Sequence, residues 1–141
     1  MKILIDTNII IDALSSREPF REDAEQIFLL AANQIEDMYI TASSATDIYY
    51  LVRKHLHSTE KAKSVMSKLY ELFRILDVTS ADCQEALSSE VSDYEDAVLS
   101  CCASRNHMDY IVTRNIKDYE KSKIQAIPPD RFINMITKDE E

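Results

Sequence analysis

The sequence predicts an α/β fold in three layers, with helices on both sides of a central, mainly parallel sheet of four or five strands. Short apolar runs rich in β-favouring residues alternate along the chain with longer segments of helical periodicity, a pattern typical of parallel sheets covered on both faces. Glycine is absent, which disfavours hairpins because their tight turns need positive φ angles. Any turns of that kind that remain are expected to use Asn or Asp.

Length and composition are those of one globular domain, expected at residues 1–137, followed by a frayed acidic tail at 138–141. No apolar run approaches the roughly 18 residues of a membrane span. Asp6 and Asp12 interrupt the start of the chain, where a signal peptide needs an apolar stretch, so we expect no membrane association and a cytoplasmic location. The three cysteines, two of them adjacent, are expected to be reduced thiols.

The first half of the chain is expected to form two strands and four helices. The strands are assigned to apolar runs at 2–6 and 38–41, and the longer helices to segments whose apolar residues recur every three or four positions. In chain order the expected elements are a strand at 2–6, a short helix at 8–14, a loop at 17–19, a helix at 20–32, a strand at 38–41, a helix from Ser43 and a helix at 59–73.

The second half continues the alternation of strands and helices. Thr79 with Asp82, and Ser92 with Glu95, are typical of helix starts, and the Ser-x-x-Glu spacing predicts a capping box at the second. The expected elements are a strand at 74–78, helices after Thr79 and after Ser92, strands at 109–112 and 126–127, and a last helix at 131–136.

Charge is distributed unevenly along the chain. The formal net charge is −9, yet residues 53–74 carry +4, so the remainder carries −13. A basic helical segment attracts phosphate backbones. The alternative interpretation is a solvated helix face with no partner.

Four acids stand where predicted elements begin or end. Asp6 and Asp118 follow the first and fourth strands, whereas Asp47 and Asp96 are expected in the first turns of later helices. Because such positions face one edge of a parallel sheet, we expect one shared site. Carboxylates crowded together repel each other unless cations bind. Oxygen ligands favour Mg²⁺ or Mn²⁺ over zinc, for which the chain has no convincing His or Cys set.

Each acid also has a structural explanation. Asp6 could cap the following helix, and Asp47 and Asp96 could complement helix dipoles. Asp93 and Glu95 are explained in this way more readily than Asp96, because the Ser92–Glu95 pair already satisfies the cap. Four acids on one rim nevertheless favour a functional site over four separate caps.

Three motifs resemble those of the PIN domain family, a metal-dependent nuclease fold, and follow the family's order over almost the whole chain. The motifs are Ile5-Asp6-Thr7-Asn8, Asp93-Tyr94-Glu95-Asp96-Ala97, and Ile111-Val112-Thr113-Arg114-Asn115 with Lys117-Asp118-Tyr119. At this chain length the resemblance is greatest to VapC-type toxins, which cleave RNA and are held inactive by a cognate antitoxin. The resemblance therefore implies metal-dependent hydrolysis of RNA phosphodiester bonds.

The resemblance also implies roles for individual residues. Asp6, Asp96 and Asp118 are the expected ligands of Mg²⁺ or Mn²⁺, and Asp47 stands where the family usually has glutamate. Aspartate is shorter by one methylene, so Asp47 either reaches a metal through water or lowers activity. The expected supporting residues are Asn8, Asp93, Thr113 and Asn115, and the candidate RNA contacts are Arg53, Lys54, Arg114 and Lys117.

Partners and alternatives follow from the same resemblance. It implies an antitoxin whose peptide covers the acidic site, and a homodimer through the helices at 20–32 and 59–73. Tyr49, Tyr50 and Tyr94 are further candidates for stacking on bases, although their helix positions predict core packing for at least two of them. The alternative function, motivated by Asp47, is a catalytically impaired RNA- or protein-binding module of the same fold.

Overall fold

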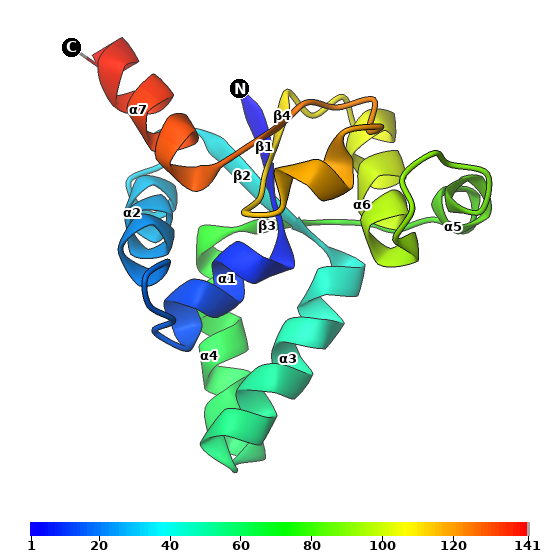
Figure 1. The fold of residues 1–141 in the computed structure, drawn as a ribbon. Coiled ribbons are helices and arrows are strands. Elements are labelled where there is room, and N and C mark those ends of the chain that lie inside the picture. The colour runs from blue at the N-terminus through cyan, green and yellow to red at the C-terminus, as the bar shows by residue number, and fades with distance from the viewer. Residues whose placement is uncertain (141) are drawn as a thin grey trace.

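The computed structural model describes residues 1–140, and five parallel strands form its central sheet. The strands are β1 (Lys2–Ile5), β2 (Asp37–Thr41), β3 (Arg74–Leu76), β4 (Tyr110–Val112) and β5 (Ala126–Ile127). Their order across the sheet is β3-β2-β1-β4-β5, and every neighbouring pair is parallel (Figure 1). The predicted class, a parallel sheet within an α/β fold, is confirmed.

The helices cover both faces of this sheet. They are α1 (Thr7–Leu14), α2 (Arg21–Ala32), α3 (Ala42–Leu56), α4 (Thr59–Leu72), α5 (Ser80–Ala86), α6 (Tyr94–Arg105), the 3₁₀ helix η1 (Ile116–Tyr119) and α7 (Pro129–Glu140). Figure 1 shows α2 and α7 on one side of the sheet and α5 and α6 on the other. No helix within residues 1–140 is long and apolar enough to cross a membrane.

The central strand β1 supplies both hydrophobic cores, because successive side chains of a strand point to opposite faces. Ile3 and Ile5 pack in the core shared with α1, α2, α3, α4 and α7. Leu4 points the other way, into a core with Leu99 of α6 and Ile111 of β4. All of these side chains are buried. The uninterrupted apolar run of β1 is thus explained by burial on both faces.

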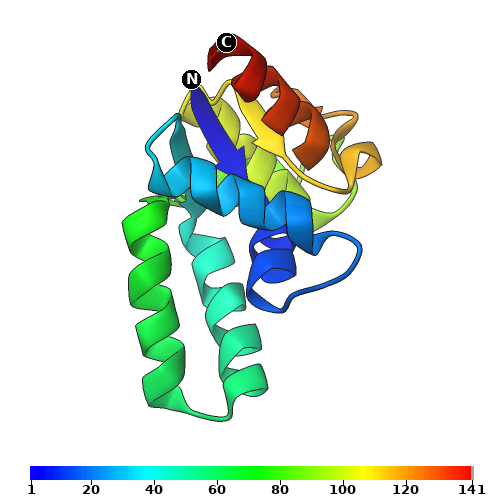
Figure 2. The same cartoon turned by 90° about the vertical axis from the view of Figure 1, so that its left-hand side faces the viewer.

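Helices α3 and α4 form an antiparallel pair that projects from the body of the molecule, as Figure 2 shows. Thr41 caps α3 by accepting a hydrogen bond from the Ser44 amide, and Ser58 caps α4 in the same way. The pair is held together by an apolar seam that includes Ile48 and Leu69, both buried. One face of each helix is therefore left uncovered by the sheet.

Two predictions about helix ends were wrong, and one was confirmed. The N-cap of α6 is Asp93 and not Ser92, because the Asp93 carboxylate accepts a hydrogen bond of 3.0 Å from the Asp96 amide. Thr79 and Asp82 do form a reciprocal capping box at α5. The last helix α7 continues to Glu140, past the expected end at 136 and over most of the expected tail at 138–141. Glu141 lies outside the described residues.

Turns with positive φ do occur, but Asn and Asp do not occupy them. Ser16, Gln34, His57 and His107 have φ between 51° and 55°. Each follows a helix, at the position where a left-handed residue lets the chain reverse direction. The expectation of Asn or Asp was wrong because the position is set by the helix end, which tolerates other residues at a cost of about 1 kcal/mol.

Candidate active site

Asp6 is fixed at the carboxyl end of the central strand by several hydrogen bonds. Its carboxylate accepts bonds from the Thr7 amide at 2.7 Å, the Thr113 hydroxyl at 2.8 Å and the Tyr119 hydroxyl at 3.2 Å. The neighbouring strands β1 and β4 place Ile5 beside Val112, so Asp6 and Thr113 emerge next to each other. Only 8% of Asp6 is exposed. The predicted convergence of the two strand ends is therefore present.

Tyr119 links Asp6 to Asp96, which comes from the first turn of α6. The Tyr119 hydroxyl lies 3.2 Å from Asp6 Oδ2 and 3.0 Å from Asp96 Oδ1. A phenol has one proton, so it can donate to only one of these carboxylates at a time. Two carboxylates facing one donor leave the site short of positive charge.

The protonation equilibria reflect this shortage. Burial raises the pKa of Asp6 despite the hydrogen bonds that it accepts. Burial, together with the charges of Asp6, Asp93 and Asp118, raises the pKa of Asp96 to about 6, although the Tyr119 hydrogen bond acts in the opposite direction. Burial and the charges of Asp6 and Asp96 also raise the pKa of Tyr119. A bound cation is the natural means of relieving such a site.

Asp47 lies on the same cleft as Asp6 and Asp96, and Asp118 lies close by. The cleft has a volume of about 430 Å³, and Glu95 adds a fourth acid to its lining. Asp47 is exposed and sits in the second turn of α3, so the expected first-turn position was wrong. Asp118, in η1, is not among the lining residues, but its charge helps raise the pKa of both Asp6 and Asp96.

The donor chemistry of the cleft fits a hard divalent cation. All candidate ligands are oxygen atoms, as Mg²⁺ and Mn²⁺ prefer. The Oδ1 atom of Asn8 is buried without a hydrogen-bond partner, while its amide nitrogen donates to Thr113 at 3.2 Å. Within residues 1–140, no three His, Cys, Asp or Glu side chains already lie close enough together to hold an ion. Asp6 and Asp96, joined through Tyr119, are the pair brought together.

The supporting residues differ in how closely they approach the site. Thr113 donates to Asp6 and accepts bonds from Asn8 and from the Asn115 amide, so its hydroxyl orders this corner of the cleft. Asp93 caps α6 and adds negative charge near Asp96. Asn115 contributes its backbone to these contacts.

The cleft contains hydroxyl and phenol groups that were not assigned roles from the sequence. Thr7 donates to the Ser44 hydroxyl at 2.8 Å, and Thr41 lies 2.9 Å from the same oxygen. These contacts join the ends of β1 and β2 beneath Asp47. The bridging role of Tyr119 was also missed. Ser43-Ser44 directly after the second predicted strand was the available signal, because it is a third polar strand end at the same edge.

The candidate RNA contacts are spread over three parts of the surface. The Arg114 guanidinium forms an ion pair with buried Asp12 and lies 4.0 Å from the centre of the Phe20 ring, so its contacts are internal. Arg53 and Lys54 lie in the last turn of α3, about 10 Å along the helix from Asp47. Lys117 is exposed in η1, next to Asp118.

The tyrosines are more exposed than expected. Tyr50 is 66% exposed and Tyr94 is 47% exposed, whereas Tyr49 is partly buried. Core packing of at least two of them was therefore a wrong expectation. For Tyr50 the reason is the projection of α3 from the body, which leaves the outer face of that helix in solvent, whereas Tyr94 is the first residue of α6.

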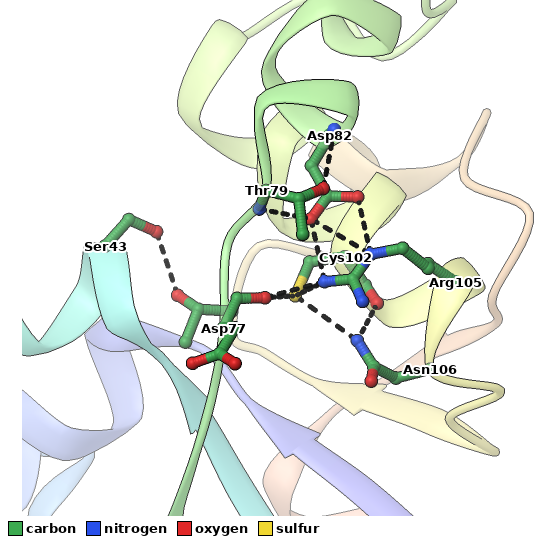
Figure 3. A network of polar contacts seen from close by, with 8 residues as sticks. Ser43, Asp77, Thr79, Asp82, Cys102, Arg105 and Asn106 are labelled. Carbon is green, nitrogen blue, oxygen red and sulfur yellow. Dashed lines mark hydrogen bonds and ion pairs between the residues drawn. The ribbon is translucent and has the colours of Figure 1, made fainter.

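A polar network behind the cleft holds α5 against α6, as Figure 3 shows. Arg105 donates to both carboxylate oxygens of Asp82 and to the Asp77 carbonyl at 2.7 Å. Burial alone would raise the pKa of Asp82, but the hydrogen bonds from Arg105 and Thr79 outweigh it and lower that pKa. Because Cys83 of α5 and several residues of α6 line the cleft, the network positions one of its walls.

The three cysteines are free, as expected. Burial raises the pKa of Cys102 to about 11, and it also raises that of Cys101. Thiols protonated at neutral pH are poor nucleophiles. Cys101 and Cys102 therefore contribute packing to α6.

A family model described as PIN domain matches residues 2–117. No curated protein matches the chain significantly.

Several solved structures share the fold. FitAcB from Neisseria gonorrhoeae is 22% identical, with a TM-score of 0.66, and the match covers 90% of this chain and 97% of that one. DNA-bound VapBC from Salmonella typhimurium is 18% identical, with a TM-score of 0.65 and coverage of 92% and 98%. A toxin–antitoxin complex from Klebsiella pneumoniae is 25% identical, with a TM-score of 0.65 and coverage of 90% and 97%.

Proposed function

The chain belongs to the PIN domain family, and from this premise we propose that it is a metal-dependent endoribonuclease that hydrolyses RNA phosphodiester bonds. One observation carries the proposal. Asp6 and Asp96, ninety positions apart in the sequence, meet across Tyr119. Burial, with the added charge of Asp118, raises the pKa of both acids, and the charge of Asp6 raises that of Asp96 further. Such shifts are characteristic of functional sites.

In this proposal Asp6, Asp96 and Asp118 hold Mg²⁺ or Mn²⁺. When bound, such an ion supplies an activated water and neutralises charge on the scissile phosphate. Asp47, exposed in the lining of the same cleft, would help to hold the ion, directly or through water. Thr113 and Tyr119 hold the Asp6 carboxylate in place through their hydroxyl groups. The alternative function, RNA or protein binding with impaired catalysis, is favoured by the shorter side chain of Asp47.

A cleavage assay separates the two functions. Structured and unstructured RNAs are incubated with the protein and Mg²⁺ or Mn²⁺, or with EDTA, and the Asp96→Asn variant is run in parallel. The matched control is Asp37→Asn, an exposed acid at the opposite, amino end of the sheet. We expect cleavage by the parent and the control only. Equal activity of parent and Asp96→Asn would exclude the enzyme for these substrates.

The Asp47→Glu variant tests the alternative directly. If the missing methylene limits catalysis, the longer carboxylate should raise the cleavage rate. RNA binding without cleavage, in both the parent and Asp47→Glu, would support the binding module and contradict the nuclease.

We propose further that the nuclease is the toxin of a toxin–antitoxin pair acting on RNA in the cytoplasm. The structural neighbour from Klebsiella pneumoniae is described as a toxin–antitoxin complex, and the one from Salmonella typhimurium as DNA-bound VapBC. An antitoxin peptide with an Arg or Lys would complement the acidic cleft. The neighbouring reading frames are first searched for a small protein with a basic tail, which is then co-expressed with this chain and assayed for cleavage after purification. A stable, inactive complex is expected. The absence of such a frame, or free active nuclease, would contradict the pair.

We also propose a homodimer through α2 and α4. The supporting observation is apolar exposure on α2, where Leu29 is 58% exposed. Sedimentation at micromolar concentration should give a dimer for the parent and a smaller species for Leu29→Glu. A monomeric parent would contradict the proposal.

A further inference from the structure

A groove runs between the two projecting helices α3 and α4, outside the candidate active site. Its volume is about 510 Å³, and its lining includes Tyr49 and Tyr50 from α3 with Met66 and Tyr70 from α4. Tyr50 and Tyr70 are 66% and 43% exposed, whereas Met66 is buried and forms the floor. The groove therefore presents aromatic rings to solvent over an apolar base.

The groove adjoins the candidate active site. Thr46 lines both the groove and the acidic cleft, and Asp47 follows it in the cleft lining. Thr46, Tyr49 and Tyr50 lie on one face of α3 because residues three or four apart are neighbours on a helix. A chain that leaves the cleft past Thr46 therefore meets Tyr50 within about one helical turn, or roughly 5 Å.

The charge of the groove differs from that of the cleft. Lys63 is the charged residue of the groove lining, which contains no acid. The surrounding segment 53–74 carries +4 within a chain of net charge −9. Arg53 lies one turn beyond Tyr49 and Tyr50 on the same helix. The groove thus combines stacking surfaces with positive charge, which is the arrangement that single-stranded nucleic acids require.

We propose, on the basis of the proposed nuclease function, that the α3–α4 groove binds the single-stranded nucleotides next to the scissile phosphodiester. Their bases stack on Tyr50 and Tyr70, and Lys63 contacts their phosphates. From Ala45 to Tyr50 the groove extends about 7–8 Å along α3, the length of roughly two stacked bases. A helical protein partner is disfavoured because the exposed lining is tyrosine and lysine, without the exposed Leu, Ile or Val anchors of a helix-binding groove.

Binding is measured in the Asp96→Asn background, so that cleavage plays no part in the result. The probe is a fluorescein-labelled 12-mer of uridine or adenosine, and the readout is fluorescence anisotropy. We expect the Tyr50→Ala/Tyr70→Ala variant to bind at least tenfold more weakly and the Tyr50→Phe/Tyr70→Phe variant to bind within twofold of the parent, because phenylalanine keeps the ring. Lys63→Ala should flatten the salt dependence of binding.

The matched control is Leu87→Ala, which removes an exposed apolar side chain at the end of α5, outside the groove. It should leave the affinity unchanged. Unaltered affinity of the double alanine variant, or no oligonucleotide binding by the parent, would overturn the proposal. If the double alanine variant without oligonucleotide sediments differently from the parent but binds the oligonucleotide with the same affinity, the groove would be assigned to a protein partner. Cleavage is assayed separately. A protein that binds the oligonucleotide through the groove but does not cleave RNA would contradict the proposed nuclease function and support the proposed binding role of the groove.

Discussion

Asp96 is the residue at which stability and the proposed function oppose each other most clearly. Its carboxylate is partly buried and faces Asp6 across Tyr119, and its pKa is raised to about 6. A carboxyl whose pKa is higher in the folded than in the unfolded chain destabilises the fold above that folded pKa. The penalty disappears as the pH falls below the unfolded value of about 4.

Replacing Asp96 with Asn should therefore stabilise the metal-free protein at pH 7.5. The amide is isosteric and can still accept the Tyr119 hydrogen bond. We expect a gain of about 1–2 kcal/mol in the free energy of unfolding in urea with EDTA, shrinking toward zero at pH 4. A variant that is less stable than the parent at pH 7.5 would show that Asp96 is a structural cap and not a strained ligand.

Arg114 should be essential for stability. It neutralises Asp12, which is 1% exposed, and removing one partner of a buried ion pair leaves an uncompensated charge. Arg114→Ala should lower the free energy of unfolding by about 3 kcal/mol. The control is Arg21→Ala, which breaks an exposed pair with Glu18 and should cost less than about 1 kcal/mol. Equal effects of the two variants would contradict this assignment.

At the residue scale, the sequence predicted where Asp6 lies in the fold better than it predicted the contacts of Asp6. Its position at the edge of the sheet was predictable because it directly follows an apolar strand, and strand ends of a parallel sheet converge. Asp118 in η1 does not line the cleft. The partner of Arg114 could not be predicted, because Asp12 is 102 positions away and nothing local relates the two side chains. The same holds for Tyr119, whose contacts with Asp6 and Asp96 depend on the placement of η1.

At the scale of elements, α5 depends on Arg105 for its position. This short helix is held to α6 through Asp82, which also completes its capping box. Arg105→Gln should accelerate amide hydrogen exchange in α5 while leaving β1 and α1 unchanged, because β1 and α1 belong to a different core. Arg17→Gln, an exposed substitution in the loop after α1, is the control. Equal exchange in the variant and the parent would contradict the role of the network.

The same network sets a dependence on pH. The pKa of Asp82 is lower in the folded chain than in the unfolded one, so its contribution to stability is present above the unfolded value and is lost as the pH falls through the folded value. Asp82→Asn should therefore lower the free energy of unfolding at neutral pH. Below pH 3 the free energies of unfolding of the variant and the parent should move closer together. Urea unfolding at pH 7 and pH 2.5 checks this, and a constant difference would contradict it.

Element boundaries were predictable where periodicity was strong. The helices at 20–32 and 59–73 and all five strands were placed to within a few residues, because burial on one or both faces imposes a regular apolar pattern. The start of α6 was not predictable, because Ser92 and Asp93 are both good N-cap residues and only the backbone path selects Asp93. The exposure of Tyr50 was also unpredictable, because it depends on α3 projecting beyond the sheet.

At the scale of the whole molecule, divalent cations should stabilise the fold. An ion that binds only the folded chain adds about 2.7 kcal/mol when its concentration is 100 times its Kd, which corresponds to a rise in Tm of roughly 5–10 °C. We expect this rise with Mn²⁺ for the parent and a much smaller one for Asp96→Asn. Sodium chloride at matched ionic strength is the control. The same Tm rise in both proteins would locate binding away from the cleft.

The central position of β1 has a consequence for how the protein is made. Strand β1 pairs with β2 on one side and with β4 on the other, and β4 begins only at Tyr110. During translation, one edge of β1 therefore stays unpaired until the residues from Tyr110 onward have left the ribosome. Thr113 and Tyr119, which fix Asp6, emerge later still. A nascent chain that ends before Thr113 would hold Asp6 without those anchors, so the candidate site is assembled only after residues 113–119 have been made.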